Sequence, residues 1–162
     1  MGDTNGTTVV ASGKSADDLA FEARMAARAE RKRGSDAQRQ ALERASMLAL
    51  DDAEQQFGDD RVKRVVVAPL CIIVIGIPDP VAVKRWRQVS RSDRAKPADK
   101  MNASDEMGKS AVLWPTAENP CKVPGLPATY EALCEVYAGL PESASAEAVK
   151  LAGILDTEEV GK

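Results

Sequence analysis

The sequence predicts a mainly helical α+β fold, with an extended N-terminal helical arm, a short two-stranded antiparallel hairpin and a helical C-terminal half. Three observations lead to this prediction. Residues 62–77 form the one strongly apolar, β-branched segment of the sequence. The segments around it are rich in Ala, Arg and Glu, which are good helix formers. Polar capping residues and prolines stand where these helical segments would begin.

The apolar segment reads VKRVVVAPLCIIVIGI, and we interpret it as a hairpin. Val and Ile lose side-chain freedom in a helix and pack well on a pleated sheet. Pro69 has no N–H to donate to a central ladder, so it divides the segment into strands over residues 62–68 and 71–77. The second strand is apolar on both faces. It is therefore expected to be buried, and helices must cover it.

The N-terminal part predicts a tail followed by a charged helical arm. Residues 1–14 are rich in Gly and Thr and lack periodicity, which is typical of a flexible tail. Ser15 and Asp18 form an S-x-x-D capping pattern that opens a helix. Gly34 and Ser35 could end this helix and start another, so a single rod and an open hairpin of two helices are both compatible with the sequence. A narrow apolar stripe follows at three- and four-residue steps: Leu42, Ala45, Ala49, Ala53 and Phe57.

The hairpin is followed by a predicted helix start at Asp79 and Pro80, with Asp as the N-cap and Pro in the first turn. In this helix Val83 and Trp86 are expected to face the sheet. Residues 90–103 show no apolar period and predict a polar loop.

The remaining sequence predicts three short helices. Ser104 caps the first of them, and Pro115 ends it. Residues 115–127 hold four prolines and predict a loop. Pro127 and Pro141 open the last two helices.

These elements predict four regions along the chain. We expect a flexible tail at 1–14 and a charged helical arm at 15–57. A compact α+β domain should cover residues 61–155, and residues 156–162 should form a frayed tail.

The residue types argue against an enzyme. The sequence has no histidine, so it lacks the usual general base near neutral pH and the commonest metal ligand. Gly13, Lys14 and Ser15 resemble the end of a phosphate-binding loop, but the earlier glycine and the preceding strand are missing. Adjacent carboxylates such as Asp51 and Asp52 point in different directions on a helix and do not form an acid–base pair. We therefore expect no catalytic residue and no cofactor.

The three cysteines do not predict a metal site or a disulfide framework. Cys71 lies in the apolar strand and is expected in the core. Cys121 and Cys134 have neither a histidine nor a C-x-x-C partner nearby. An odd number of cysteines favours a reducing compartment. The longest apolar run is shorter than a membrane-spanning helix requires, so no membrane segment is expected.

Charge is unevenly distributed along the chain. The formal net charge is −3, but residues 61–109 carry eleven Lys and Arg against five Asp and Glu, whereas residues 110–162 carry three against eight. Such asymmetry can serve a polyanion, a protein partner or self-association. The residues that we expect to bind a partner are the arginines on one face of the arm together with the large apolar side chains of the arm and the following helix: Arg24, Arg28, Arg31, Leu42, Phe57 and Trp86.

The order of elements resembles that of bacteriophage tail assembly chaperones, small proteins encoded in phage tail modules. The resemblance covers about residues 60–155. It rests on VVVAPLCIIVIGIPDPVAVKRW at 65–86, SAVLWP at 110–115 and PATYEALCEVYAGLPESASAEAVKLAG at 127–153. It implies a non-enzymatic protein that binds another phage protein, such as the tape measure, in the host cytoplasm. The resemblance assigns no functional residue.

Two alternatives remain open at the level of sequence. The chain could be a structural component that stays in the virion, or a regulator that binds nucleic acid through its basic arm. Steeply salt-dependent binding to DNA would favour the second alternative.

Overall fold

The computed structural model describes residues 13–159, and side chains up to residue 153. The chain divides into two compact units, with the boundary between Asp36 and Ala37. The described part contains five α-helices and one three-stranded antiparallel sheet. The predicted α+β, mainly helical fold class is therefore confirmed.

Helix α1 spans Ala16–Phe57 and begins at the predicted capping box. The Asp18 N–H donates to Ser15 Oγ at 3.1 Å, and the Ser15 N–H donates to Asp18 Oδ2 at 3.2 Å. The helix has no break at Gly34 and Ser35, so of the two alternatives it adopts the continuous one. A glycine in a helix interior costs about 1 kcal/mol relative to alanine, which weakens a helix without ending it.

The sheet has the order β1–β2–β3, with β1 at Lys63–Ala68, β2 at Cys71–Ile75 and β3 at Val112–Trp114. Strands β1 and β2 form the predicted antiparallel hairpin. The third strand was not expected, because Val112–Trp114 was assigned to the end of a helix. These residues pair with β2 instead, since Val and Trp fit a half-buried pleated surface better than a helix end.

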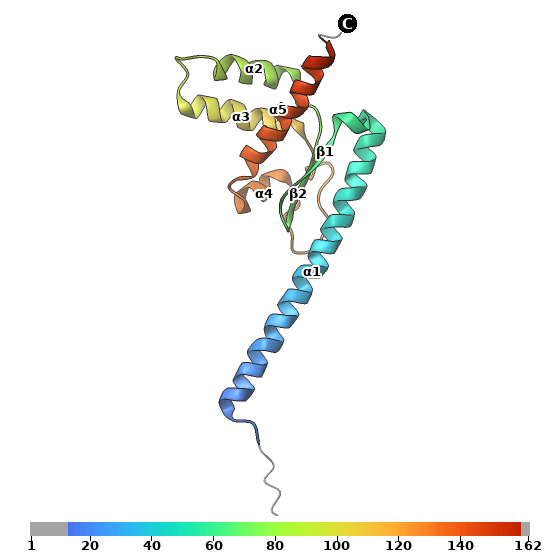
Figure 1. The fold of residues 1–162 in the computed structure, drawn as a ribbon, viewed down its shortest axis with the longest axis vertical. Helices are drawn as coiled ribbons and strands as arrows, with labels where there is room; N and C mark the ends of the chain where they lie inside the picture. Colours follow the sequence, from blue (N-terminus) through green and yellow to red (C-terminus); the bar gives the residue numbers. More distant parts are fainter. Residues whose placement is uncertain (1–12, 160–162) are drawn as a thin grey trace, which may run out of the picture. The chain divides into compact units, whose positions relative to one another are not determined.

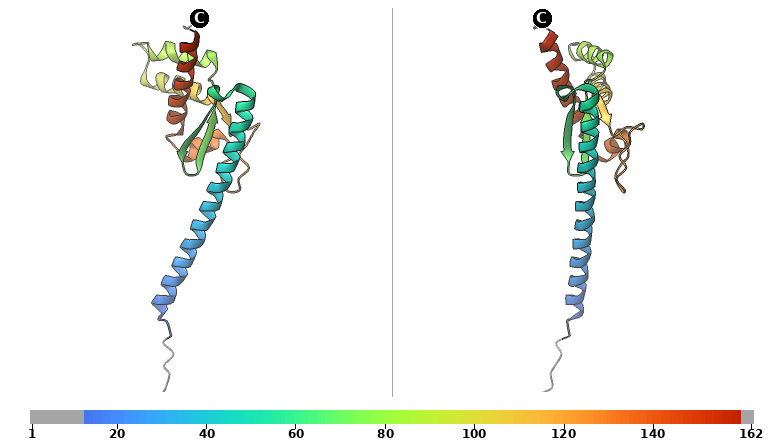
Figure 2. Two further views of the ribbon diagram at one scale, coloured as in Figure 1. Left: turned by 45° about the vertical axis from the view of Figure 1, so that its right-hand side comes forward. Right: turned by 90° about the vertical axis from the view of Figure 1, so that its right-hand side faces the viewer.

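Strand β2 lies in the middle of the sheet and is buried along its whole length. One face carries Cys71, Ile73 and Ile75, which pack with helices α3 and α5. The opposite face carries Ile72 and Val74, which pack with the later half of α1. Figure 1 and Figure 2 show these helices on the two sides of the hairpin. The expectation that helices cover this strand is confirmed.

The later half of α1 belongs to the compact unit that holds the sheet. Leu42, Ala49 and Ala53 are buried in the second core, beside Ile72 and Val74 of β2. The compact unit accordingly begins at residue 37, whereas the sequence placed this part of the helix in the arm. An Ala-rich stripe suffices here because small side chains let a helix approach the sheet closely.

Helix α2 spans Pro80–Ser90 and starts as predicted. The Asp79 carboxylate accepts a hydrogen bond from the Val81 N–H at 2.7 Å, and Pro80 occupies the first turn. Val83 and Trp86 are partly buried against the first core.

Helix α3 spans Pro97–Ala111, so the prediction of a loop over residues 90–103 was wrong from residue 97 onward. Pro97 fits the first turn, where its missing N–H has no helical partner to lose. Ala103 and Met107 then bury one side of the helix. Because polar residues lie between Ala103 and Met107, the sequence pattern did not indicate an apolar helix face here.

The last two helices are α4 at Tyr130–Val136 and α5 at Leu140–Glu159. Helix α4 begins three residues after Pro127, because Thr129 is its N-cap and accepts from the Ala132 N–H at 3.3 Å. Pro141 lies in the first turn of α5, as expected.

Candidate protein-interaction sites

The first candidate site is the part of α1 that belongs to the first compact unit, residues 13–36, which we call the docking segment. Every residue in it is exposed. Phe21 is 64 % exposed and Met25 is 44 % exposed, so two large apolar side chains of this segment face solvent. The capping box at Ser15 gives this exposed helix a defined beginning.

One face of the docking segment combines apolar and basic side chains. Phe21, Met25, Arg28 and Lys32 follow one another at steps of four, three and four residues, so they share a face. Two more arginines adjoin this row. We call the six residues the basic–apolar face: Phe21, Arg24, Met25, Arg28, Arg31 and Lys32.

The arginines of this face have no ion-pair partner among the described residues. The ion pair found in the segment joins Lys14 Nζ to Glu22 Oε1 at 2.6 Å. Arg24, Arg28 and Arg31, for which partner binding stays a prediction, are exposed and have no ion pair within the described part of the chain. Phe21 and Met25 were missed, although their four-residue spacing next to the arginines carried the signal.

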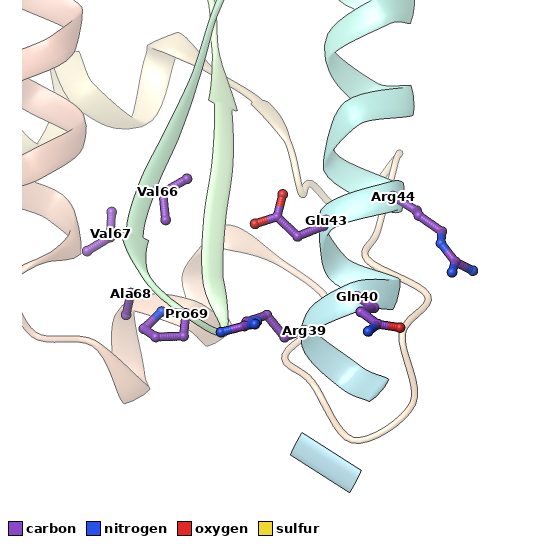
Figure 3. A pocket seen from close by; sticks show the side chains of 8 residues that line it. All are labelled: Arg39, Gln40, Glu43, Arg44, Val66, Val67, Ala68 and Pro69. Carbon is purple, nitrogen blue, oxygen red and sulfur yellow. The ribbon is translucent and has the colours of Figure 1, made fainter. Parts of the chain in front are cut away.

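The second candidate site is a groove between α1 and β1, of about 720 Å³ (Figure 3). Val66 forms part of its floor and is 53 % exposed. Beside it, Arg64 pairs with Glu43 and donates from Nε to Ser46 Oγ at 2.9 Å. The lining comprises Arg39, Gln40, Glu43, Arg44, Val66, Val67, Ala68 and Pro69.

The third candidate site is a hollow of about 590 Å³ in which Phe57 is one of the lining residues. Phe57 is 44 % exposed and lies beside Ile77, Pro78 and Leu113. Of the predicted partner-binding residues in the second unit, Phe57 is thus at a surface and Trp86 is partly buried. Leu42 is only 3 % exposed and packs inside the chain's own core. An apolar stripe in the sequence does not show whether its residues pack inside the same chain or against a partner, because both kinds of burial need large apolar side chains.

The fourth candidate site is a groove of about 440 Å³ to which α2, α3, α4 and α5 contribute; we call it the α3–α4 groove. Two ion pairs lie along it: Arg85 Nη1 with Glu106 Oε2 at 2.8 Å, and Lys109 Nζ with Glu131 Oε1 at 3.1 Å. Its lining residues are Arg85, Asn102, Asp105, Glu106, Lys109, Tyr130, Glu131, Cys134 and Pro141.

The titratable groups of the α3–α4 groove differ in character. Tyr130 is 5 % exposed, and apart from the adjacent Cys134 thiol, a weak hydrogen-bonding group, its hydroxyl has no partner in the described structure. Burial and the neighbouring Cys134 raise the pKa of Tyr130, so the phenol is neutral near pH 7. A hydrogen bond from its own backbone N–H and another from Lys109 lower the pKa of Glu131, which holds this carboxylate ionised.

The cysteines do not form a reactive centre. Cys71 and Cys121 are buried, and Cys134 is half-buried. Burial raises the pKa of Cys71 to about 11, with a smaller contribution from Cys134. No group of three or more Cys, Asp or Glu side chains that could hold a metal ion occurs among the described residues.

A thiol-labelling experiment tests this burial. In the folded protein Cys134 should react first with an aromatic disulfide reagent at pH 8, while Cys71 and Cys121 should react at the rate of unfolding. All three thiols should react quickly in denaturant, and mass spectrometry of peptides would identify the labelled positions. Equal rates for Cys71 and Cys134 in native buffer would contradict the buried position of Cys71.

Comparison with protein-family models, with curated proteins and with solved structures finds no match. None of the described helices is both long and apolar enough to cross a membrane. Support for a function therefore comes from the surface chemistry of the chain and from the order of its elements.

Proposed function

We propose that this chain is a non-enzymatic assembly protein that acts through protein–protein contacts, and that the docking segment binds the partner. The observation that carries the proposal is the basic–apolar face. On it, two large apolar side chains and arginines without an ion pair among the described residues share one exposed helix surface.

The physical reason lies in how helices are stabilised. In water a helix of this length gains most of its stability from packing an amphipathic face. The docking segment exposes Phe21 and Met25, so a partner groove would supply the missing contact. An amphipathic helix that lays its apolar side chains into a groove is a recurring mode of recognition. Arginines at the edge of such a contact guide the encounter and set its specificity.

The resemblance to phage tail assembly chaperones suggests the setting. In that setting the partner is another phage protein, such as the tape measure, and the chain acts in the host cytoplasm. Retention in the finished virion is the alternative. A regulator that binds nucleic acid is a second candidate, because Arg24, Arg28 and Arg31 are exposed and form no ion pair with any residue that the structure describes. Glu22 and Glu30 interrupt this positive charge, which favours a protein surface.

The proposal can be tested by capture of proteins encoded beside this chain. The tagged full-length chain should retain one of them in a fixed ratio. A variant with Phe21→Glu and Met25→Glu should lose that protein, because two charges on the apolar row cannot enter an apolar groove. A matched control with Leu48→Glu and Val81→Glu also changes two exposed apolar residues, and it should retain the partner.

Two results would contradict the proposal. One is capture of the same protein by the Phe21→Glu, Met25→Glu variant at the level of the unchanged chain. The other is binding of duplex DNA by the purified chain with a steep salt dependence, which would favour the nucleic-acid candidate.

A further inference from the structure

We propose that the docking segment of one copy of this chain binds in the α3–α4 groove of a second copy. This inference rests on the proposed function, because it names the partner of the same segment. Two conditions must hold. The groove must be able to bind a basic helix, and it must suit the docking segment better than the other candidate sites do.

The groove contains a carboxylate that is free to bind a cation. Glu106 and Glu131 are engaged by Arg85 and Lys109, but Asp105 has no ion pair among the described residues. Glu135 follows Glu131 by one helical turn on α4 and is exposed, so it extends the same acidic face. The α3–α4 side of the groove thus offers negative charge that the chain itself does not neutralise.

Tyr130 supplies an independent sign of a missing ligand. Its side chain is almost fully buried, it lines the groove, and its hydroxyl meets only the weakly bonding Cys134 thiol among the described residues. Buried polar groups are nearly always paired, so an unpaired one needs an explanation. An arginine guanidinium carries five N–H donors in a planar fork. Seated in the groove, it would donate to the Asp105 carboxylate, and a side-chain movement that opens Tyr130 would make the phenol oxygen a second acceptor.

The basic–apolar face has the side chains that such a groove requires. Arg24, Arg28 and Arg31 are available for the carboxylates, since none is paired within the described structure. Met101 precedes Asp105 by four residues on α3 and is 62 % exposed, which gives Phe21 and Met25 an apolar neighbour at the edge of the groove.

The other candidate sites fit a basic helix less well. The groove between α1 and β1 is lined by Arg39 and Arg44 against one carboxylate, Glu43, so its lining is net positive. The lining of the α3–α4 groove is net negative, because three carboxylates outnumber its two cations, Arg85 and Lys109. The hollow beside Phe57 holds one acidic side chain, Asp79, against Arg61. Charge complementarity therefore selects the α3–α4 groove.

The contact joins two different surfaces of the chain. Each copy offers one docking segment and one groove, so two copies can bind each other reciprocally, or the association can form a larger ring or a chain of copies. Variants that are changed at only one of the two surfaces can therefore be mixed to test the contact.

The test uses two full-length variants and their mixture. In the segment variant Arg24, Arg28 and Arg31 become Glu. In the groove variant Asp105 and Glu135 become Lys. The control variant, Asp93→Lys with Glu118→Lys, makes the same charge change at exposed positions outside the groove lining. Sedimentation from about 1 μM to 1 mM measures self-association, a range in which moderate protein contacts are detected.

The unchanged chain and the control should self-associate, and each of the other two variants should associate about 100-fold more weakly, as expected when opposite charges become like charges. An equimolar mixture of the segment and groove variants should associate again. In that mixture the groove of the first and the segment of the second are both intact, and the two reversed surfaces also carry opposite charges. A neutral variant, Asp105→Asn with Glu135→Gln, should lose less of the self-association affinity. It keeps the test valid if the lysine substitutions disturb folding.

Three results would overturn the inference: an unchanged chain that is monomeric at 1 mM, a groove variant that associates like the control, or a mixture that stays monomeric. These results do not overturn the proposed function. If the segment residues are needed to capture a different protein while the groove variant captures it normally, the docking segment still binds a partner, and that partner is not a second copy.

Discussion

Replacing Ile73 by alanine is expected to lower the free energy of unfolding by about 2–5 kcal/mol, the usual range for deleting a large aliphatic side chain from a packed core. Ile73 is fully buried on the central strand β2, where it packs with α3 and α5. The substitution removes apolar contacts and leaves a cavity that the sheet cannot close, because both neighbouring strands fix the backbone.

Urea unfolding followed by tryptophan fluorescence would measure this loss. Val66→Ala is the matched control, because Val66 lies on the paired strand β1 but is about half exposed. That control should change the free energy of unfolding by less than about 1 kcal/mol. An equal loss in the two variants would mean that β2 is not the centre of the core.

Replacing Gly108 by alanine is expected to destabilise the compact unit by about 1–3 kcal/mol or more, as overpacking does. A Cβ at Gly108 would lie 2.7 Å from Ser145 Oγ and 2.8 Å from the Ser145 backbone N. Ser145 cannot rotate away freely, since its hydroxyl donates to the Ser104 and Pro141 carbonyl oxygens at 2.7 and 2.8 Å. Helices α3 and α5 would have to separate.

Gly34→Ala provides the contrast, because nothing lies within 4 Å of the position of its Cβ. In this exposed helix interior the alanine should raise helicity and stabilise the helix by about 0.5–1 kcal/mol. Thermal melts by circular dichroism would show opposite shifts for the two variants. A Gly108→Ala variant that melts with the unchanged chain would contradict the close approach of α3 and α5.

The sequence predicted helix caps and the hairpin turn well, because the residues that form them have strong local conformational preferences. Ser15 with Asp18, Asp79 with Pro80, and the hairpin divided at Pro69 all occur as expected. These signals depend on hydrogen bonds or backbone restrictions within a few residues. They can therefore be recognised without knowing the tertiary structure.

Features that depend on distant contacts were not predicted. Strand β3 exists because Trp114 and Val112 pair with β2, about 40 positions earlier in the sequence. The start of α3 at Pro97 depends on Ala103 and Met107 meeting α5, and neither residue alone marks a helix.

The sequence pattern locates some residues of the candidate sites but does not test their use. The arginines of the docking segment share one helix face and Phe57 ends the apolar stripe, and their part in binding stays a prediction. The α3–α4 groove was not foreseen, since its residues come from four helices and only the fold brings Asp105 beside Tyr130. Trp86 was expected at the sheet and lies partly buried against the first core.

The position of β2 between two cores has a consequence for cooperativity. Alternate side chains of this single strand belong to different hydrophobic clusters, with Ile73 and Ile75 in one and Ile72 and Val74 in the other. If α1, or α3 and α5, detached from the sheet, one face of β2 would be exposed to water. The strand would then be less well ordered for the helices that pack on its other face. The two clusters are therefore thermodynamically coupled through five residues, and residues 37–153 should unfold in one all-or-none transition rather than layer by layer.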